Sequence, residues 1–552
     1  MYHLIPVSCM EKVLTDRRPS GEGFSGHMTA LRGETISFQI AYFHDGMTLL
    51  RGAAEASAGV RVRYVDSVPC AYPCHTGGRT DSDYLSEKPG LYPDILRDVP
   101  ACGFPMLSCS WGALWVDIAV PADAEPGLHS ARVDVRRLPD LRQSGDAGEP
   151  LGSIELQYEV LRHVLPALPI PHTEWFHCDC LANYYGVEVF SEEHWRILEN
   201  FLKSAADHHC NMILTPIFTP PLDTAFGGER RTVQLVDVAV TGSDSYHFGF
   251  DRLRRWIALC RGLGFRYFEI SHLFSQWGAV AAPKIMGEKD GALCQLFGWD
   301  TDAAGPEYRS FLHQLLPALR AELSSLGVLE DCWFHISDEP SMEQLESYRL
   351  AYEGVSRELA GCHIMDALSD YSFYEKGLVE TPICATNHIA PFLAKRPPRL
   401  FAYYCTAQWE KVSNRFIAQP GYRTRVLGMQ LFKENIDGFL QWAYNFYNSE
   451  YSFYPIDPFS CTDAGGAFPS GDPFLVYPGP DRKPIDSLRL MLIDAAFSDY
   501  CALHLLAEKI GRKQAVAVLD PGNELAIDRY PMSAGGIQTL RNRVNEKLRE
   551  LQ

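Results

Sequence analysis

The sequence predicts a multidomain β and α/β protein, with an N-terminal antiparallel β-sandwich followed by a (β/α)8 TIM-type barrel. Two observations predict this fold class. In the first part of the chain, short apolar segments alternate at period two between turn signals, as in sheets with one face in a core. After residue 172, short apolar strands alternate with helical patterns, which is typical of parallel sheets. The 552 residues are too many for one ordinary domain and sufficient for two.

Three segments predict the sandwich. Residues 34–43, 114–120 and 153–160 each place apolar side chains on one face of a strand, because successive side chains of a strand point to opposite faces. Residues 165–172 hold three prolines and are expected to link the sandwich to the barrel.

Eight short apolar segments follow this linker and are predicted to form the barrel strands. They are residues 173–177, 211–217, 267–273, 332–337, 363–368, 382–387, 399–404 and 438–446. Helical patterns lie between most of them; the first follows Ser191, a residue type that favours helix N-caps, and the eighth covers residues 486–511. The connections after the fifth and sixth strands are short, with weak helical patterns. Eight strand–helix units over this length match a (β/α)8 barrel with insertions.

We therefore expect three units. A β-sandwich domain takes residues 1–165, a catalytic barrel takes residues 173–511, and a C-terminal extension at 512–552 packs on the barrel or the sandwich. Within the extension, residues 514–520 (QAVAVLD) are expected to form a strand that a charged helix follows.

The composition excludes several classes of protein. The chain has 50 Lys and Arg against 69 Asp and Glu, a net charge of −19, which disfavours nucleic-acid binding because phosphates are bound by clustered basic residues. The first 20 residues show no signal-peptide pattern, and no uninterrupted apolar stretch is long enough to span a membrane. We expect a cytoplasmic protein without a membrane partner and with mostly reduced cysteines; the oligomeric state stays open, with a homo-oligomer among the alternatives.

Histidines and cysteines gather in three short segments, CAYPCH, HCDC and HHC. None has the paired C-x2-C spacing of a zinc module. The chain also lacks a phosphate-binding loop and a dinucleotide-binding fingerprint. The sequence therefore predicts no metal and no organic cofactor.

Functional side chains of such a barrel are expected at the C-terminal ends of its strands. Aromatic and polar residues gather at these strand ends, Trp277 and Tyr403 among them. A Gly- and Pro-rich loop at 465–484, which contains Asp472, is expected to cover the mouth of the barrel. Aromatic rings stack on the apolar faces of sugars, and carboxylates bind hydroxyl groups, although any single aromatic residue is more often part of the packing. The predicted substrate-binding residues are Trp175, His335, Asn387, Tyr404, Trp442, Tyr444, Asn445 and Asp472.

The catalytic residues are predicted to be Asp338 and Glu339, at the end of the fourth barrel strand in CWFHISDEP. Pro340 is expected to hold Glu339 extended, so that both carboxylates reach the barrel mouth. When two carboxyl groups lie close together, the pKa of at least one of them rises. A general acid that works near neutral pH requires such a raised pKa. The alternative is that Asp338 only caps the next helix, but Ser341 and Gln344 form a capping box without it.

Two mechanisms remain open on the residues alone. A retaining glycosidase with an enzyme nucleophile needs a second carboxylate about 5 Å from the acid, and the end of the seventh strand offers only Glu410. A substrate-assisted mechanism needs no such group, because the 2-acetamido carbonyl of the sugar attacks C1.

Several motifs taken together resemble glycoside hydrolase family 123. They are FHISDEP, GFLQWAYNFYN, GDPFLVYPGPD followed by DSLRL, and, upstream, YPDIL followed by LWVDIAVPADAEPG. The resemblance covers about residues 92–500 and implies a β-N-acetylgalactosaminidase with a sandwich and a barrel, in which Asp338 orients the acetamide and Glu339 is the acid/base. One departure lies in the eighth helix, IDAAFSDYCAL, where the first acidic and basic positions of relatives are changed; it puts the sugar preference in question.

The predicted function is an exo-acting glycoside hydrolase that releases a terminal β-linked N-acetylgalactosamine from a glycan or glycoconjugate by a retaining, substrate-assisted mechanism. Within enzymes, the alternatives are a β-N-acetylglucosaminidase and an ordinary retaining β-glycosidase. An alternative of another class is a non-catalytic carbohydrate-binding protein on the same scaffold.

Overall fold

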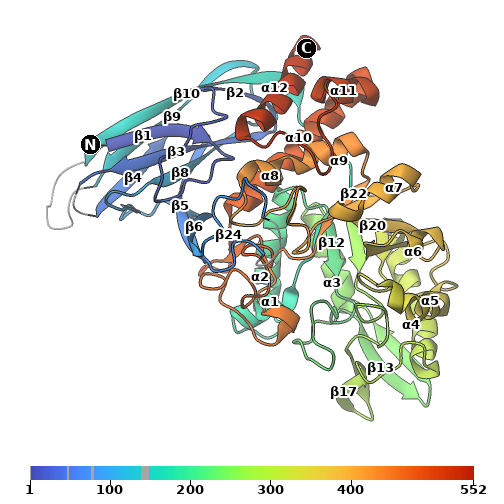
Figure 1. Ribbon diagram of the computed structural model, residues 1–552. Helices are drawn as coiled ribbons and strands as arrows, with labels where there is room; N and C mark the ends of the chain where they lie inside the picture. The colour runs from blue at the N-terminus through green and yellow to red at the C-terminus, as the bar shows by residue number, and fades with distance from the viewer. Residues whose placement is uncertain (1, 47–48, 76–79, 139–147) are drawn as a thin grey trace.

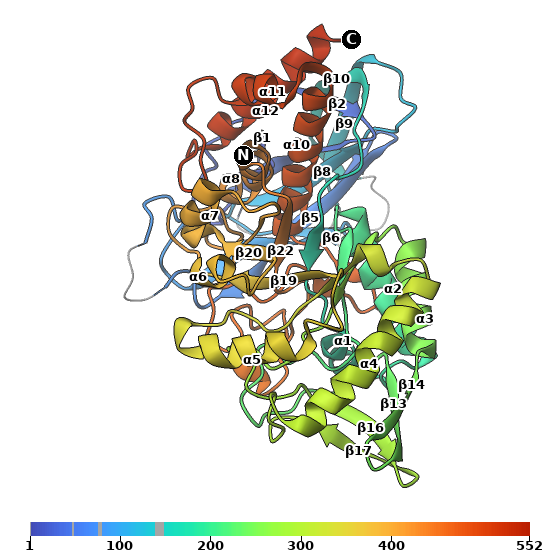
Figure 2. The ribbon, with the colours of Figure 1, turned by 90° about the vertical axis from the view of Figure 1, so that its right-hand side faces the viewer.

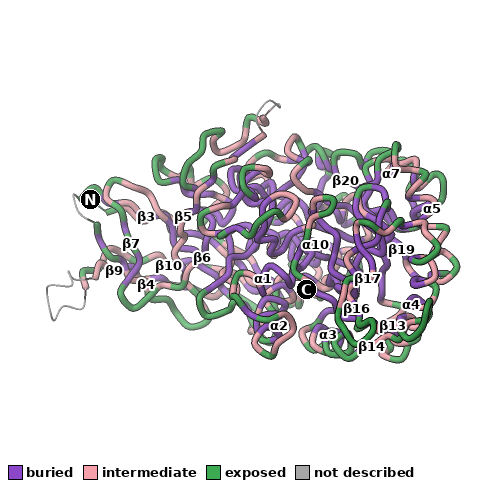
Figure 3. The backbone as a smooth tube through the Cα atoms, turned by 90° about the horizontal axis from the view of Figure 1, so that it is seen from below, coloured by how far each residue is buried: buried purple, intermediate pink, exposed green. Residues whose placement is uncertain are grey.

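The computed structural model describes residues 2–46, 49–75, 80–138 and 148–552. Strands from the N-terminal part lie at one end of the molecule, and a barrel with its surrounding helices forms the other (Figure 1). Buried residues run through the interior of both regions, and exposed residues lie mainly on the outer loops (Figure 3).

Two five-stranded sheets form the N-terminal region. The first contains, in spatial order, β1 (Tyr2–Ser8), β3 (Thr35–His44), β8 (Gly112–Ala119), β5 (Val60–Cys70) and β6 (Gly90–Asp98); the second contains β2 (His27–Arg32), β10 (Glu149–Val164), β9 (Gly127–Arg137), β4 (Leu50–Ala56) and β7 (Phe104–Met106). Their shared core includes Phe38 and Val116 of the first sheet and Val133 and Leu156 of the second. The alternating segments therefore form strands as predicted, but the sandwich is not wholly antiparallel, because β2 and β10 run parallel.

Eight parallel strands close into a barrel. They are β11 (His172–Glu174), β12 (Met212–Thr215), β15 (Tyr267–Ile270), β18 (Cys332–Phe334), β19 (His363–Leu368), β20 (Thr381–Ala385), β21 (Phe401–Tyr403) and β22 (Gly438–Gln441). Each predicted strand overlaps one of them, and the pairing of β11 with β22 closes the ring. Side chains such as Leu214, Trp333, Met365 and Ile383 fill the interior, so the barrel is a packed core.

The predicted TIM-type (β/α)8 barrel is nevertheless wrong, because the helices do not follow the strands one by one. The helices of this region are α1 (Cys178–Tyr184), α2 (Glu192–Asp207), α3 (Asp251–Gly262), α4 (Pro306–Ser325), α5 (Leu345–Val355), α6 (Ser372–Glu375), α7 (Ala390–Lys395), α8 (Gly421–Arg425), α9 (Leu427–Glu434) and α10 (Leu488–Ile510). After β19 and β20 the connections are too short for full helices, and α6 and α7 have only 4 and 6 residues. The molecule has a closed parallel β-barrel with an irregular helical surround and additional antiparallel sheets.

Antiparallel strands interrupt the connections of the barrel. Two hairpins, β13 (Asp237–Gly242) with β14 (Ser245–Gly249) and β16 (Ile285–Lys289) with β17 (Ala292–Phe297), join into a four-stranded sheet. They follow β12 and β15, and they form the lower end of the molecule in Figure 2. A small pair, β23 (Tyr477–Pro478) with β24 (Pro484–Ile485), follows β22.

The C-terminal extension is helical. Residues 512–519 form α11 (Arg512–Leu519), so the predicted strand over QAVAVLD is wrong; α12 (Ala534–Glu550) is the expected charged helix. The α12 helix lies beside β10 and β2 (Figure 2) and also contacts α8 and α10. The division of the chain at 1–165, 173–511 and 512–552 stays a proposal.

The α10 helix belongs to the core. By length and composition it could cross a membrane, but 72% of its most apolar window is buried inside the protein. It packs against α8, α9, α11 and α12.

A buried ion pair ties the first sheet to α10 and to the loop after β22. Arg489 binds Asp94 at 2.8 Å, and both side chains are 0% exposed. Arg489 also donates to the carbonyls of Gly471 and Phe474, both at 2.6 Å, and Tyr477 donates to Asp94 at 2.6 Å. The loop that was expected to cover the mouth is thus anchored from behind by this pair.

Replacement of Asp94 by alanine should destabilise the protein strongly, because it leaves the Arg489 charge buried and unpaired. We expect the free energy of unfolding in urea to fall by about 3–5 kcal/mol. Asp98→Ala, on the same strand but in an exposed pair with Arg61, is the matched control and should change it by less than about 1 kcal/mol. Similar losses in the two variants would contradict this account of the interface.

Candidate active site

A cavity of about 250 Å³ opens at the C-terminal ends of the barrel strands. Six aromatic residues line it: Trp175, Trp277, Tyr403, Trp442, Tyr451 and Phe468. Four carboxylates share the cavity, Asp223, Asp338, Glu339 and Glu450. A volume of this size suits one sugar ring with its substituents.

Asp338 and Glu339 follow β18 directly, and both line the cavity. The backbone carbonyl of Asp338 accepts a hydrogen bond from the Trp277 N–H at 2.9 Å. Glu339 has a φ of 40°, so the expectation that Pro340 holds Glu339 extended is wrong. Left-handed backbone in a residue before proline is unfavourable, and such strain is kept mainly where a side chain must be aimed for function.

The helix after this segment does not use the two acids as caps. Ser341 and Gln344 form the predicted capping box, with the Ser341 N–H donating to the Gln344 side chain at 2.9 Å. Both carboxylates therefore remain available to the cavity.

Burial raises the pKa of both carboxyl groups of the pair. For Asp338, the neighbouring Glu339 charge raises the pKa further. For Glu339, a hydrogen bond that the Tyr403 hydroxyl donates to Oε1 opposes the effect of burial on the pKa. The pair consequently holds a proton at a higher pH than free carboxylic acids do.

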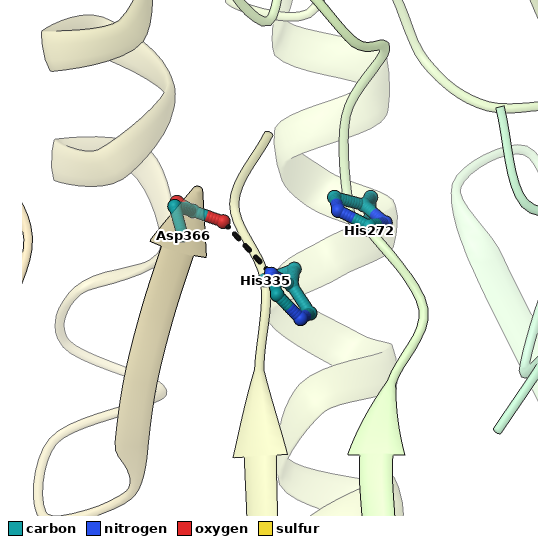
Figure 4. Close-up of side chains that lie close together, drawn as sticks. All are labelled: His272, His335 and Asp366. Atoms are coloured by element: carbon teal, nitrogen blue, oxygen red, sulfur yellow. Dashed lines mark hydrogen bonds and ion pairs between the residues drawn. The ribbon is translucent and has the colours of Figure 1, made fainter. Parts of the chain in front are cut away.

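A buried network lies behind the pair, at the base of the cavity. His335 bonds Asp366 through Nδ1 at 3.1 Å, as Figure 4 shows. Through Nε2 it bonds Glu269 at 2.7 Å. Burial alone would lower the pKa of His335, but the hydrogen bonds to these two carboxylates and their charges raise it to about 9. His335 is therefore an imidazolium that donates from both nitrogens. Trp175 donates to the same Glu269 oxygen at 2.6 Å, so the network also fixes an aromatic wall of the cavity.

Among the described residues, His272, His335 and Asp366 form the group whose ligand atoms lie close enough to hold a metal ion, within 4.8 Å of one another. Figure 4 shows the His272 ring beside that of His335, with the ring centroids 4.3 Å apart. Both nitrogens of His335 are already bonded to carboxylates, and Asp366 also accepts from Tyr348 and from the Ile336 N–H. A metal would have to displace these bonds, so the donor set fits a hydrogen-bonded network better than a metal site.

Of the predicted substrate-binding residues, Trp175 and Trp442 line the cavity. Asp472 lies behind Trp442 and accepts a hydrogen bond from its indole N–H at 3.1 Å. Burial raises the pKa of Asp472 to about 7. His335 lies beneath the cavity, so it and Asp472 support lining residues.

The other four predicted residues do not line the cavity. Tyr404 is fully buried against Phe439, and Tyr444 stacks on Phe176. Asn445 bonds the backbone of His177 in both directions, at 2.9 and 3.1 Å. Asn387 is exposed and accepts a hydrogen bond from Gln408.

Of the neighbouring residues Tyr403 and Tyr404, only Tyr403 lines the cavity. Neighbours on a strand point to opposite faces; Tyr403 belongs to the interior cluster and Tyr404 to the outer one. Tyr403 therefore reaches Glu339, and Tyr404 does not.

The cavity residues that were not singled out from the sequence include Asp223, Gln276, Glu450, Tyr451 and Phe468. They lie in connections after β12, β15 and β22. The signal for Asp223 was its place shortly after a barrel strand. Its carboxyl Oδ2 is buried without a hydrogen-bond partner among the described residues, and burial raises its pKa to about 7.

Comparison with known proteins identifies the family. The family described as "Glycoside hydrolase 123, catalytic domain" matches residues 175–506. A solved structure of a family 123 glycoside hydrolase from Clostridium perfringens, studied for glycolipid glycan hydrolysis, is similar with a TM-score of 0.74 and 14% identity over 100% of this chain and 98% of that one. The Bacteroides thetaiotamicron EndoBT-3987 structure is 7% identical over 84% of this chain and 97% of that one, but its TM-score of 0.23 is too low to support an argument. No curated protein matches the sequence. The extent of the family match shows that this chain is a glycosidase that belongs to glycoside hydrolase family 123.

Proposed function

We propose that this glycoside hydrolase removes a terminal β-linked N-acetylgalactosamine from a glycan, with retention, by a substrate-assisted mechanism. The observation that carries the proposal is the adjacent pair Asp338 and Glu339 in a cavity of monosaccharide size with aromatic walls. The published subject of the similar Clostridium perfringens enzyme, glycolipid glycan hydrolysis, agrees with a glycan as substrate.

In the proposed first step, Glu339 donates its proton to the glycosidic oxygen as the bond from C1 to that oxygen breaks. The carbonyl oxygen of the 2-acetamido group attacks C1 and forms an oxazolinium ion, while Asp338 accepts a hydrogen bond from the acetamide N–H. In the second step, Glu339 takes a proton from water, the water oxygen attacks C1, and the acetamide is restored. The raised pKa of both carboxyl groups supports an acid that keeps its proton to a higher pH than a free carboxylic acid does.

The ordinary retaining mechanism has one observation in its favour. Asp223 and Glu450 also line the cavity, so further carboxylates are present in the connections after β12 and β22, which the sequence did not indicate. A non-catalytic sugar-binding protein is less well supported, because binding alone does not require two crowded, half-buried acids.

A panel of nitrophenyl glycosides separates these alternatives. We expect kcat/KM for the β-N-acetylgalactosaminide to exceed that for the β-galactoside by at least about 100-fold, because the galactoside lacks the internal nucleophile. The β-N-acetylglucosaminide should be a weaker substrate than its epimer. Comparable cleavage of the galactoside, with a glycosyl adduct on Asp223 or Glu450 in mass spectrometry, would support the ordinary mechanism instead.

Glu339→Gln tests the role of the acid. The loss in kcat/KM should be about 10²- to 10⁴-fold for a methyl glycoside, whose leaving group needs a proton. It should be far smaller for a dinitrophenyl glycoside, whose leaving group departs as a stable anion. Glu343→Gln, an exposed residue four positions away, should affect neither substrate. Equal losses on both substrates would exclude the acid role.

Tyr403→Phe tests the control of that acid. Burial raises the pKa of Glu339 and the Tyr403 hydrogen bond lowers it, so removal of the hydroxyl should raise the pKa again. Because the proposed acid must be protonated, the basic limb of the kcat/KM profile should move to higher pH by about one unit. Tyr404→Phe is the matched control, since the Tyr404 hydroxyl has no hydrogen-bond partner in the described part of the chain. A shift to lower pH in Tyr403→Phe would contradict the assignment.

A further inference from the structure

Lys12, which follows β1, is a buried cation without an acidic partner. Its side chain is only 6% exposed. Its Nζ donates to the backbone carbonyls of Phe416 and Ile417 at 3.2 and 2.8 Å, and no ion pair joins it to a carboxylate in the described part of the chain. Buried charges are ordinarily paired with a charge of opposite sign, so the surroundings of Lys12 lack a counter-charge.

One carboxylate acts on Lys12 from nearby, but it is already engaged. Asp94 acts on Lys12 through its charge, yet it is bound to Arg489 at 2.8 Å. Two buried cations thus share a single carboxylate. Burial, the largest effect, lowers the pKa of Lys12; Asp94 and Cys70 raise it, Arg489 lowers it, and the result is a pKa of about 7.

Lys12 also lines a cavity of about 230 Å³ at the junction of the sandwich, the barrel and the C-terminal extension. One water molecule needs only about 10–15 Å³ of such space, so the cavity has room for a larger ligand. Two further cations, Arg17 and Arg18, line it together with two acids, Glu11 and Glu22. Basic groups therefore outnumber acidic ones there, although the chain as a whole has a net charge of −19.

The charged groups of the cavity differ in what already binds them. The Glu11 carboxylate accepts hydrogen bonds from the N–H groups of Ser20 and Gly21, at 2.5 and 3.0 Å. Arg17 donates from one nitrogen to the carbonyl of Leu85 at 2.7 Å, which holds its guanidinium at the rim. Arg18 is exposed and forms no ion pair within the described ranges, so it remains available to a ligand.

We propose that Lys12, Arg17 and Arg18 bind a tetrahedral oxyanion, a sulfate or phosphate group, which supplies the counter-charge that the fold lacks. Guanidinium groups bind oxyanions through paired N–H donors, and an ammonium group adds a compact charge. The site shares no lining residue with the catalytic cavity, so the inference goes beyond the proposed function. The same chemistry has two sources, a free inorganic anion and an ester on a sugar.

A bound anion should stabilise the folded protein, because the site exists only where distant segments meet. Besides the N-terminal segment, Tyr422 of α8 and Ala534 of α12 line the cavity. A ligand that binds the folded state alone raises the free energy of unfolding. The melting temperature should therefore rise with sulfate more than with chloride at the same ionic strength.

The charge on Lys12 gives the binding a characteristic pH dependence. Burial lowers the pKa of Lys12 to about 7, so the amine loses its proton as the pH rises above that value. Sulfate, which does not titrate in this range, binds the charged amine. Its Kd should therefore increase by about tenfold or more between pH 6.5 and pH 8.5.

Calorimetric titration of the full chain with sodium sulfate tests the site. The wild-type protein should bind one sulfate. Lys12→Met, which removes the charge and keeps an unbranched side chain, should weaken binding at least about tenfold. Arg18→Gln should weaken it about threefold. Lys376→Met, at an exposed lysine after α6, is the matched control and should leave the Kd unchanged.

No saturable sulfate binding by the wild-type protein, or equal affinity in Lys12→Met, would overturn the proposal. If Lys12→Met does not fold, Arg18→Gln decides by the same criterion, since its side chain is exposed. An affinity that does not fall from pH 6.5 to pH 8.5 would exclude Lys12 as the binding cation. Galactose 6-sulfate identifies the source: tighter binding than sulfate supports an anion carried by a sugar, and equal or weaker binding supports a free anion at the same site.

Discussion

The charged His335 side chain, held between Glu269 and Asp366, is the interaction on which the geometry of the site depends. It joins β15, the segment after β18, and β19 in the interior of the barrel. His335 and the two acidic side chains satisfy one another's buried polar atoms, and each group would be costly to bury without a partner. Because Trp175 also bonds Glu269, β11 is tied to the same network, and four barrel strands take their relative positions from it.

This network explains how two acids can stand side by side at the end of β18. Asp366 accepts hydrogen bonds from the Ile336 N–H, two residues before Asp338, and thereby fixes the chain as it leaves the strand. The strained backbone of Glu339 then turns its carboxylate towards Tyr403. A rigid base beneath and an aromatic wall around the acids are what a preorganised catalytic site requires.

Much of the fold could be predicted from the sequence, and the limits have physical causes. Barrel strands are buried on both faces, so their apolar segments were recognisable, and all eight were found. The helices around them were less predictable, because short connections such as that of α6 are set by packing more than by pattern.

The site was only partly predictable. Asp338 and Glu339 were recognisable in the sequence as an unusual pair of adjacent acids. The positive φ of Glu339 could not be predicted from the residue types around it. Tyr404 was predicted to bind substrate, but Tyr403 is the residue that lines the cavity. Neighbouring residues of a strand point to opposite faces, so a shift of one residue exchanges the inner side chain for the outer one. Asp223 and Glu450 lie more than 200 positions apart, and only the closed barrel brings them to one cavity.

The central claim is that the substrate supplies its own nucleophile. Hydrolysis of β-N-acetylgalactosaminides with one, two or three fluorine atoms on the acetyl group measures this most directly, because fluorine withdraws electron density from the carbonyl oxygen. The account predicts that kcat/KM falls steeply with each added fluorine. A rate that is insensitive to fluorination would contradict it and would assign the nucleophile to a carboxylate of the protein.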